Sequence, residues 1–247
     1  MIKFDKDYVM TINGAAATSP DTQPVFNPAN KDVIAQVPDC SESQFETTVT
    51  AARQAFVPWS KRPIEERQQL VAKLGDLLEE HAEEFMALLT KEQGKPRSGT
   101  EWEIFGSAIW LKEIAKQTLP DEIIEESDER KVVTRYTPLG VVGAIVPWNF
   151  PMLLSMWKIA PALVSGCTVV LKPSPDTPLC NLKFVELAQQ VLPPGVLNCV
   201  SGGNDLGRWM TAHPDINKIA FTGSTETGRH VYRSAGETIK RVTLELG

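Results

Sequence analysis

Three polar residues in the second half of this 247-residue sequence each follow a short apolar run. Asn149 stands in the proline-bounded turn "PWNFP", Lys172 opens "KPSPDTP", and Glu245 ends "RVTLE". An asparagine amide can stabilise a developing oxyanion, a lysine can bind phosphate or ribose hydroxyls, and a glutamate can act as a general base. Taken singly, each is more often an ordinary surface or turn residue, so their chemistry depends on whether the fold brings them together.

The stretch "AFTGSTETGRH" (220–230) indicates a strand, a glycine turn and the start of a helix. Gly223 lets the backbone approach a ligand, and Ser224 can cap a helix that begins near Thr225. The free N–H groups and positive dipole end of that helix then face the same point. Gly223 and Gly228 have the spacing of a P-loop, but the next two residues are not the Lys and Ser or Thr that the motif requires. The turn therefore suits a diphosphate better than a nucleoside triphosphate, with an ordinary glycine turn as the alternative.

Apolar, β-branched runs alternate with helical segments from Gly140 onward. The runs are "GVVGAIVPW", "TVVLKPS", "LNCVSG", "KIAFTGS" and "RVTLELG", and the helices are expected at 152–165, 179–191, 204–212 and 225–236. This alternation predicts an α/β fold with a five-stranded, parallel, doubly wound, Rossmann-like sheet. Ligands of such sheets bind beyond the carboxyl ends of the strands. The polar residues described above all fall at that edge.

The first half of the chain predicts a hairpin and long helices. We expect a hairpin over 24–37, a helix from the capping box at Ser41 to Pro58, a second helix from Pro63 to about Lys91, and a third over 98–117. The acidic segment "DEIIEESDER" (121–130) is expected to be a solvated loop. Residues 131–137 are expected to form a strand that could pair outside its own domain.

Composition excludes several classes of function. The net charge of −6 and pI near 5.2 argue against nucleic-acid and anionic-membrane binding. The amino terminus offers no signal-peptide core, and no apolar run is long enough to span a bilayer. The four cysteines have neither C-x-x-C spacing nor a His cluster that would suggest a metal, and they are expected to be small, buried or incidental thiols. A reducing, cytoplasmic location is therefore predicted.

The motifs "VPWNFP", "TVVLKPS", "FTGSTETG" and "LELG", in this order, closely resemble the NAD(P)-dependent aldehyde dehydrogenase superfamily. "EQGKP" (92–96) and "FNPAN" resemble the amino-terminal half of that family. The resemblance implies that Asn149 stabilises the oxyanion and that Glu245 activates the hydrolytic water. It also implies NAD or NADP as the cofactor, held by Pro147, Trp148, Lys172, Gly223, Ser224, Thr225, Glu226, Thr227, Gly228 and Leu246.

Two departures from the family pattern affect these expectations. Pro175 stands where many NAD-using members carry a glutamate that binds the ribose hydroxyls, which leaves both NAD and NADP open. The family's nucleophilic cysteine lies a few dozen residues beyond the "LELGGK" segment, and this sequence ends at Gly247. We therefore expect a cofactor-binding half that does not oxidise aldehydes alone. The alternatives are a non-catalytic dinucleotide-binding or interaction module and a vestigial gene product.

The same comparison predicts the domain organisation. Residues 1–118 would form a hairpin and helices that pack on the cofactor domain, 119–138 part of an oligomerisation element, and 139–247 the dinucleotide-binding sheet. The expected partners are a nicotinamide dinucleotide and, where a catalytic domain is supplied, an aldehyde. A second copy of the chain, or another chain of aldehyde dehydrogenase type, could pair with the oligomerisation element.

Overall fold

A seven-stranded sheet forms the centre of the molecule in the computed structural model, which describes residues 2–247. Its strand order is β11-β10-β7-β8-β9-β1-β2. Five neighbouring strands are parallel: β7 (Val141–Ile145), β8 (Thr168–Lys172), β9 (Leu197–Cys199), β10 (Lys218–Gly223) and β11 (Arg241–Leu246). The predicted five-stranded, parallel, doubly wound sheet is therefore confirmed. The order reverses between β7 and β10, and such a switch point opens a crevice at the carboxyl ends of the strands.

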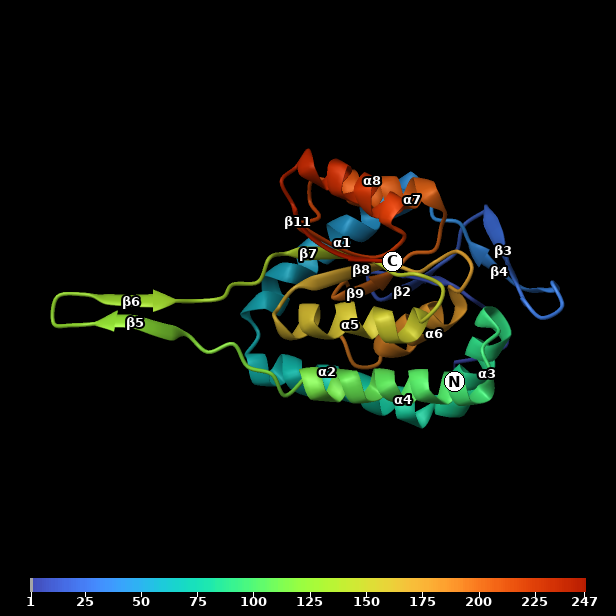
Figure 1. The fold of residues 1–247 in the computed structure, drawn as a ribbon, viewed down its shortest axis with the longest axis horizontal. Coiled ribbons are helices and arrows are strands. Elements are labelled where there is room, and N and C mark those ends of the chain that lie inside the picture. Colours follow the sequence, from blue (N-terminus) through green and yellow to red (C-terminus); the bar gives the residue numbers. More distant parts are fainter. Residues whose placement is uncertain (1) are drawn as a thin grey trace.

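Helices cover both faces of this sheet (Figure 1). α5 (Pro151–Val164) and α6 (Leu179–Ala188) pack on one face, and α1 (Glu42–Lys61), α7 (Asn204–Ala212) and α8 (Thr225–Gly236) pack on the other. α2 (Ile64–Glu80), α3 (Ala82–Gln93) and α4 (Arg97–Ile114) form an outer layer over α5 and α6. The central strands β7 and β8 are almost entirely buried because both of their faces are covered, which explains why their sequences are apolar runs rather than alternations.

Two short strands extend the sheet beyond the predicted five. β1 (Met10–Ile12) pairs antiparallel with β9, and β2 (Ala15–Ala17) pairs with β1. Asn13, at positive φ in the turn between them, donates its backbone N–H to the Asn198 side chain at 2.9 Å. Strands of three residues are too short for an alternating pattern to be recognised in the sequence.

The hairpin and the first helix cap are confirmed, whereas two helix boundaries were wrong. β3 (Thr22–Phe26) and β4 (Val33–Pro38) form the hairpin, and Ser41 begins α1 with a complete capping box. α1 continues past Pro58 to Lys61, because buried Trp59 anchors its last turn through a hydrogen bond to the Leu163 carbonyl at 3.2 Å. The single helix expected from Pro63 to Lys91 is two helices that meet at His81, whose φ of −108° and ψ of 23° break the helix.

The acidic segment 121–130 was wrongly predicted to be a loop. Its first half is β5 (Glu122–Glu126), which pairs antiparallel with β6 (Lys131–Thr134) in an arm that projects from the body of the molecule (Figure 1). Arg130 pairs with Glu125, and Lys131 pairs with Glu126 at 2.9 Å. These ion pairs reduce the repulsion among the acidic side chains, so an acidic segment can remain extended.

No helix within residues 2–247 combines the length and the apolar character that crossing a bilayer requires.

Candidate functional site

A pocket of about 600 Å³ lies at the switch point of the sheet, beyond the carboxyl ends of the strands. Ile145 of β7, Lys172 of β8 and Phe221 of β10 form its floor, and α7 and α8 form its walls. Gly203 and Gly207 leave the α7 side open. The other lining residues are Asn204, Arg208, Thr211, Ala212, Thr227, His230, Val231 and Ser234. Of the sequence-predicted site residues, this pocket brings together Lys172 and Thr227.

The turn at 223–228 adjoins this pocket and has the geometry of a capped helix start. The Ser224 side chain accepts the backbone N–H of Thr227 at 3.2 Å, so Ser224 is the N-cap of α8. Thr225 donates its hydroxyl to the Gly247 carbonyl at 2.6 Å, which ties the start of α8 to the end of β11. Gly228 lies so close to Leu246 that a Cβ atom would come within 2.5 Å of the leucine side chain. The predicted positions Thr225 and Gly228 thus lie against the end of β11, which carries Leu246.

Lys172 lies buried at the end of β8, with 6% of its surface exposed. Burial lowers its pKa to about 8, because desolvation disfavours the ammonium, while Asp39 partly opposes this shift. Its Nζ lies 3.4 Å from the Pro173 carbonyl, a weak contact. An ammonium group with so few partners can bind an anion or a ribose hydroxyl that enters the pocket.

Asn149 lies in an exposed turn between β7 and α5, with Trp148 also exposed and Pro147 half-buried. The Asn149 Oδ1 atom accepts the backbone N–H of Phe150 at 3.0 Å. With its oxygen occupied, the side-chain amide presents its N–H groups to other partners.

Glu245 is exposed near the end of β11, and sequence reasoning missed the lysine that faces it. Lys158 of α5 donates to the Thr222 hydroxyl at 2.7 Å, and Thr222 pairs with Glu245 across β10 and β11. Burial lowers the pKa of Lys158 to about 8, and the charge of Glu245 partly offsets that shift. The signal was present in the sequence, because Lys158 is the one charged residue in the otherwise apolar segment "MLLSMWKIAPALV".

The lowered pKa values of Lys158 and Lys172 carry a testable prediction. In [¹³Cε]lysine-labelled protein, two resonances should titrate with midpoints near pH 8, well below the ordinary lysine pKa of about 10.4. Lys158→Met should remove one of them and Lys172→Met the other. Lys73→Met, which removes an exposed lysine, is the control and should leave both resonances in place. Titration of all lysine resonances near pH 10 would contradict this prediction.

Glu92, also missed, holds the start of α6 from the end of α3. Its two carboxylate oxygens accept the backbone N–H groups of Leu179 and Cys180 at 2.7 and 3.0 Å. Complete burial raises its pKa to about 7, and the two backbone hydrogen bonds only partly offset the desolvation. Because α6 follows the loop that Lys172 opens, this contact holds the far end of that loop against α3.

The raised pKa of Glu92 makes folding stability depend on pH with a defined sign. The folded state holds this proton more tightly than the unfolded chain, so the stabilisation is complete below about pH 4 and is lost as the pH rises through about 7. Glu92→Gln should therefore be most destabilising relative to the native chain at about pH 4. The deficit should shrink by up to about 3 kcal/mol by pH 7.5 in urea unfolding experiments. A deficit that grows with pH would contradict the assignment.

The four cysteines are buried and unpaired, as predicted. Burial raises the pKa of Cys40 to about 12 and that of Cys199 still further. Cys180 opens α6, but burial and the neighbouring Glu92 raise its pKa rather than lower it. The raised pKa values keep the Cys40, Cys180 and Cys199 thiols protonated at neutral pH, which makes them poor nucleophiles.

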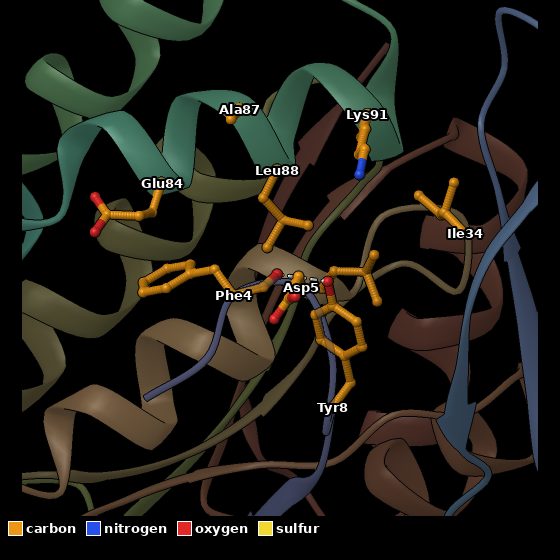
Figure 2. A pocket seen from close by; sticks show the side chains of 9 residues that line it. Phe4, Asp5, Tyr8, Ile34, Glu84, Ala87, Leu88 and Lys91 are labelled. Carbon is orange, nitrogen blue, oxygen red and sulfur yellow. Dashed lines mark hydrogen bonds between the residues drawn. The ribbon is translucent and has the colours of Figure 1, made fainter. Parts of the chain in front are cut away.

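A second pocket, of about 240 Å³, lies between the amino-terminal segment and α3 (Figure 2). Phe4, Asp5 and Tyr8 face Glu84 and Lys91 across it, and the Tyr8 hydroxyl donates to the Phe4 carbonyl at 2.7 Å. It contains none of the predicted site residues. The functional edge of the sheet therefore lies elsewhere.

Comparisons with known proteins agree with this geometry. The chain is 42% identical over 234 residues to the aldehyde dehydrogenase LUC3 of Fusarium sp, a match that covers 95% of this chain and 50% of that protein. It is 38% identical over 238 residues to the 3-sulfolactaldehyde dehydrogenase of Pseudomonas putida, covering 94% and 49%. The chain spans about half the length of the curated relatives it matches.

A solved structure has the same fold over nearly the whole chain. The NAD⁺ complex of an aldehyde dehydrogenase from Bacillus cereus superimposes with a TM-score of 0.95 at 40% identity, covering 99% of this chain and 52% of that one. The sequence profile of the aldehyde dehydrogenase family matches residues 15–247. The chain belongs to the aldehyde dehydrogenase family.

Proposed function

We propose that this chain is the dinucleotide-binding portion of an NAD(P)-dependent aldehyde dehydrogenase. The observation that carries the proposal is the pocket at the switch point, which opens beside the capped amino terminus of α8. A positive helix end beside a pocket with an apolar floor suits a ligand that joins an anionic diphosphate to a nucleoside.

Each predicted residue takes a role in this arrangement. The adenosine would occupy the pocket against Lys172, and the diphosphate would lie at the turn 223–228, where glycine allows close approach. The nicotinamide would then extend toward Asn149 and Glu245, past Pro147 and Trp148, and supply the hydride acceptor. Asn149 would donate its amide N–H to the substrate oxyanion, and Glu245 would take a proton from the hydrolytic water. We also propose that the dinucleotide contacts Thr225, Glu226, Thr227 and Leu246.

We infer that the site accepts both NAD and NADP. Pro175 is exposed and carries no carboxylate that would repel a 2′-phosphate. Arg208 lines the pocket, and its only ion-pair partner within residues 2–247, Asp205, is exposed beside it on α7. A guanidinium group at this position could turn from Asp205 to a 2′-phosphate.

Direct titration tests the binding proposal. The 247-residue chain should bind both NADH and NADPH saturably, with Kd below about 1 mM by fluorescence or calorimetry. Arg208→Ala should weaken NADPH more than NADH, while Arg53→Ala, which removes another exposed Arg–Asp pair, should change neither. If the chain binds neither NADH nor NADPH, the proposal is overturned.

The cysteines of this chain are buried, so none of them is available to attack an aldehyde. We therefore propose that aldehyde oxidation takes place in a polypeptide that contains this chain and also supplies a thiol nucleophile. Aldehyde-dependent reduction of NAD or NADP by the native polypeptide tests this step. A native polypeptide that binds a dinucleotide without such reduction would instead support the non-catalytic binding module.

We further propose that 1–118 and 139–247 act as one cofactor-binding unit and that the arm within 119–138 pairs with another chain. Ile123, Ile124 and Val132 are exposed on β5 and β6, and an isolated two-stranded ribbon gains stability from added strands. Sedimentation of the chain with and without residues 122–134 tests the pairing.

We also propose a cytoplasmic location, because four unpaired cysteines suit the reducing conditions of the cytoplasm.

A further inference from the structure

A buried ion pair lies beneath the turn that carries Asn149. Glu103, in the middle of α4, is completely buried. Its Oε1 atom accepts the backbone N–H groups of Met152 and Leu153 at 2.8 and 3.2 Å, in the first turn of α5. Its Oε2 atom forms the ion pair with Lys95. One carboxylate thus caps a helix from outside and holds a lysine.

Lys95 extends this contact to the turn itself. Its Nζ atom donates to the Asn149 carbonyl at 2.8 Å and lies 4.0 Å from the centroid of the Phe150 ring. Only 11% of the Lys95 side chain is exposed, so solvent competes weakly for these contacts. A single ammonium group therefore contacts Glu103, Asn149 and Phe150.

Other contacts of the turn include the Phe150 N–H bond to the Asn149 Oδ1 atom, the edge-on packing of Trp102 against Phe150, and the donation of the Asn181 amide to the Pro151 carbonyl. The Phe150 side chain, which precedes α5, does not cap that helix. The prolines on either side of the turn, Pro147 and Pro151, have no backbone N–H to donate. The capping carboxylate comes instead from Glu103, where the helix dipole favours a negative charge. Loss of Lys95 would leave that carboxylate buried without its counter-charge, which is strongly unfavourable.

We propose that Lys95 and Glu103 are positioning residues for Asn149, holding its backbone so that the side-chain amide keeps one orientation. This inference rests on the function proposed for Asn149. It assigns a role to Lys95 of the "EQGKP" segment and to Glu103, neither of which touches the dinucleotide pocket.

Nuclear magnetic resonance of the 247-residue chain labelled with [¹⁵N]asparagine tests the proposal, with the Asn149 side-chain amide signals assigned from Asn149→Ala. Lys95→Met and Glu103→Gln should each shift or broaden these signals, and Lys95→Arg should restore them at least in part. Glu103→Gln keeps an acceptor for the α5 amides, so it separates loss of the charge from loss of the cap. Lys116→Met is the matched control, because it removes an exposed lysine–glutamate pair.

The same samples are titrated with NADH, and we expect a Kd within about twofold of the native value. If the native chain does not bind NADH, the proposed function fails. If it binds but Lys95→Met leaves the Asn149 signals where Lys116→Met leaves them, the positioning proposal fails. Should a single variant not fold, the Lys95→Met/Glu103→Gln double variant removes both charges together, and unchanged Asn149 signals there would equally overturn it.

Discussion

Replacing Gly140 with alanine should destabilise the chain by roughly 3–5 kcal/mol, a large share of the stability of a typical domain. Gly140 precedes β7 with φ of +125°, a conformation that side chains rarely adopt, and a Cβ atom there would lie 2.0 Å from the Asn217 Oδ1 atom. That oxygen accepts the backbone N–H of Val141 at 2.9 Å. The alanine must therefore displace Asn217 and leave a buried N–H unpaired.

The effect should be large because Asn217 connects three strands. Its backbone N–H donates to the Val141 carbonyl at 2.9 Å, and its carbonyl accepts the N–H of Arg241 at 3.1 Å, so it fixes the starts of β7, β10 and β11 together. Urea unfolding of Gly140→Ala measures the loss. Gly236→Ala is the control, since a Cβ at Gly236 meets no described atom within 4 Å, and it should be neutral or stabilise by up to about 1 kcal/mol. A loss below about 1 kcal/mol for Gly140→Ala would contradict this account.

Local patterns in the sequence were sufficient to predict the parallel sheet. The runs around Val141, Val169 and Ile219 are apolar because those strands are covered on both faces. The turn at Ser224 was equally readable, since an N-cap and its glycine are adjacent in the chain. Sequence reasoning thus predicts the elements that are determined by residues close together in the chain.

Features that depend on distant partners were missed. Glu92 and Glu103 accept the backbone N–H groups of Leu179 and Met152, which lie 87 and 49 residues later in the chain. Nothing in the local sequence distinguishes them from other helix glutamates. The strand at Glu122 depends on ion pairs with Arg130 and Lys131 on the other side of the hairpin. The break at His81 interrupts a continuous apolar stripe. In each case tertiary contacts outweighed the local preference.

The second large effect concerns binding alone. Gly207→Leu should weaken NADH binding by at least about tenfold while leaving the fold intact. Gly207 lines the pocket from the interior of α7, and a Cβ there would meet only the Lys172 Cε atom, at 3.9 Å. The added Cβ therefore fits without a clash, and the rest of the leucine side chain takes up space in the pocket. Leucine is also the better helix former by about 0.8 kcal/mol.

Gly236→Leu is the matched control, because it adds the same side chain at the end of α8, where a Cβ meets no described atom within 4 Å. It should leave the Kd for NADH unchanged. Fluorescence titration and thermal unfolding of both variants separate binding from folding. If Gly207→Leu melts like the native chain and binds NADH equally well, the dinucleotide does not occupy this pocket. If it melts normally and binding is lost while Gly236→Leu retains it, the pocket between α7 and α8 is where the adenosine lies, because space in that pocket is what the substitution removes.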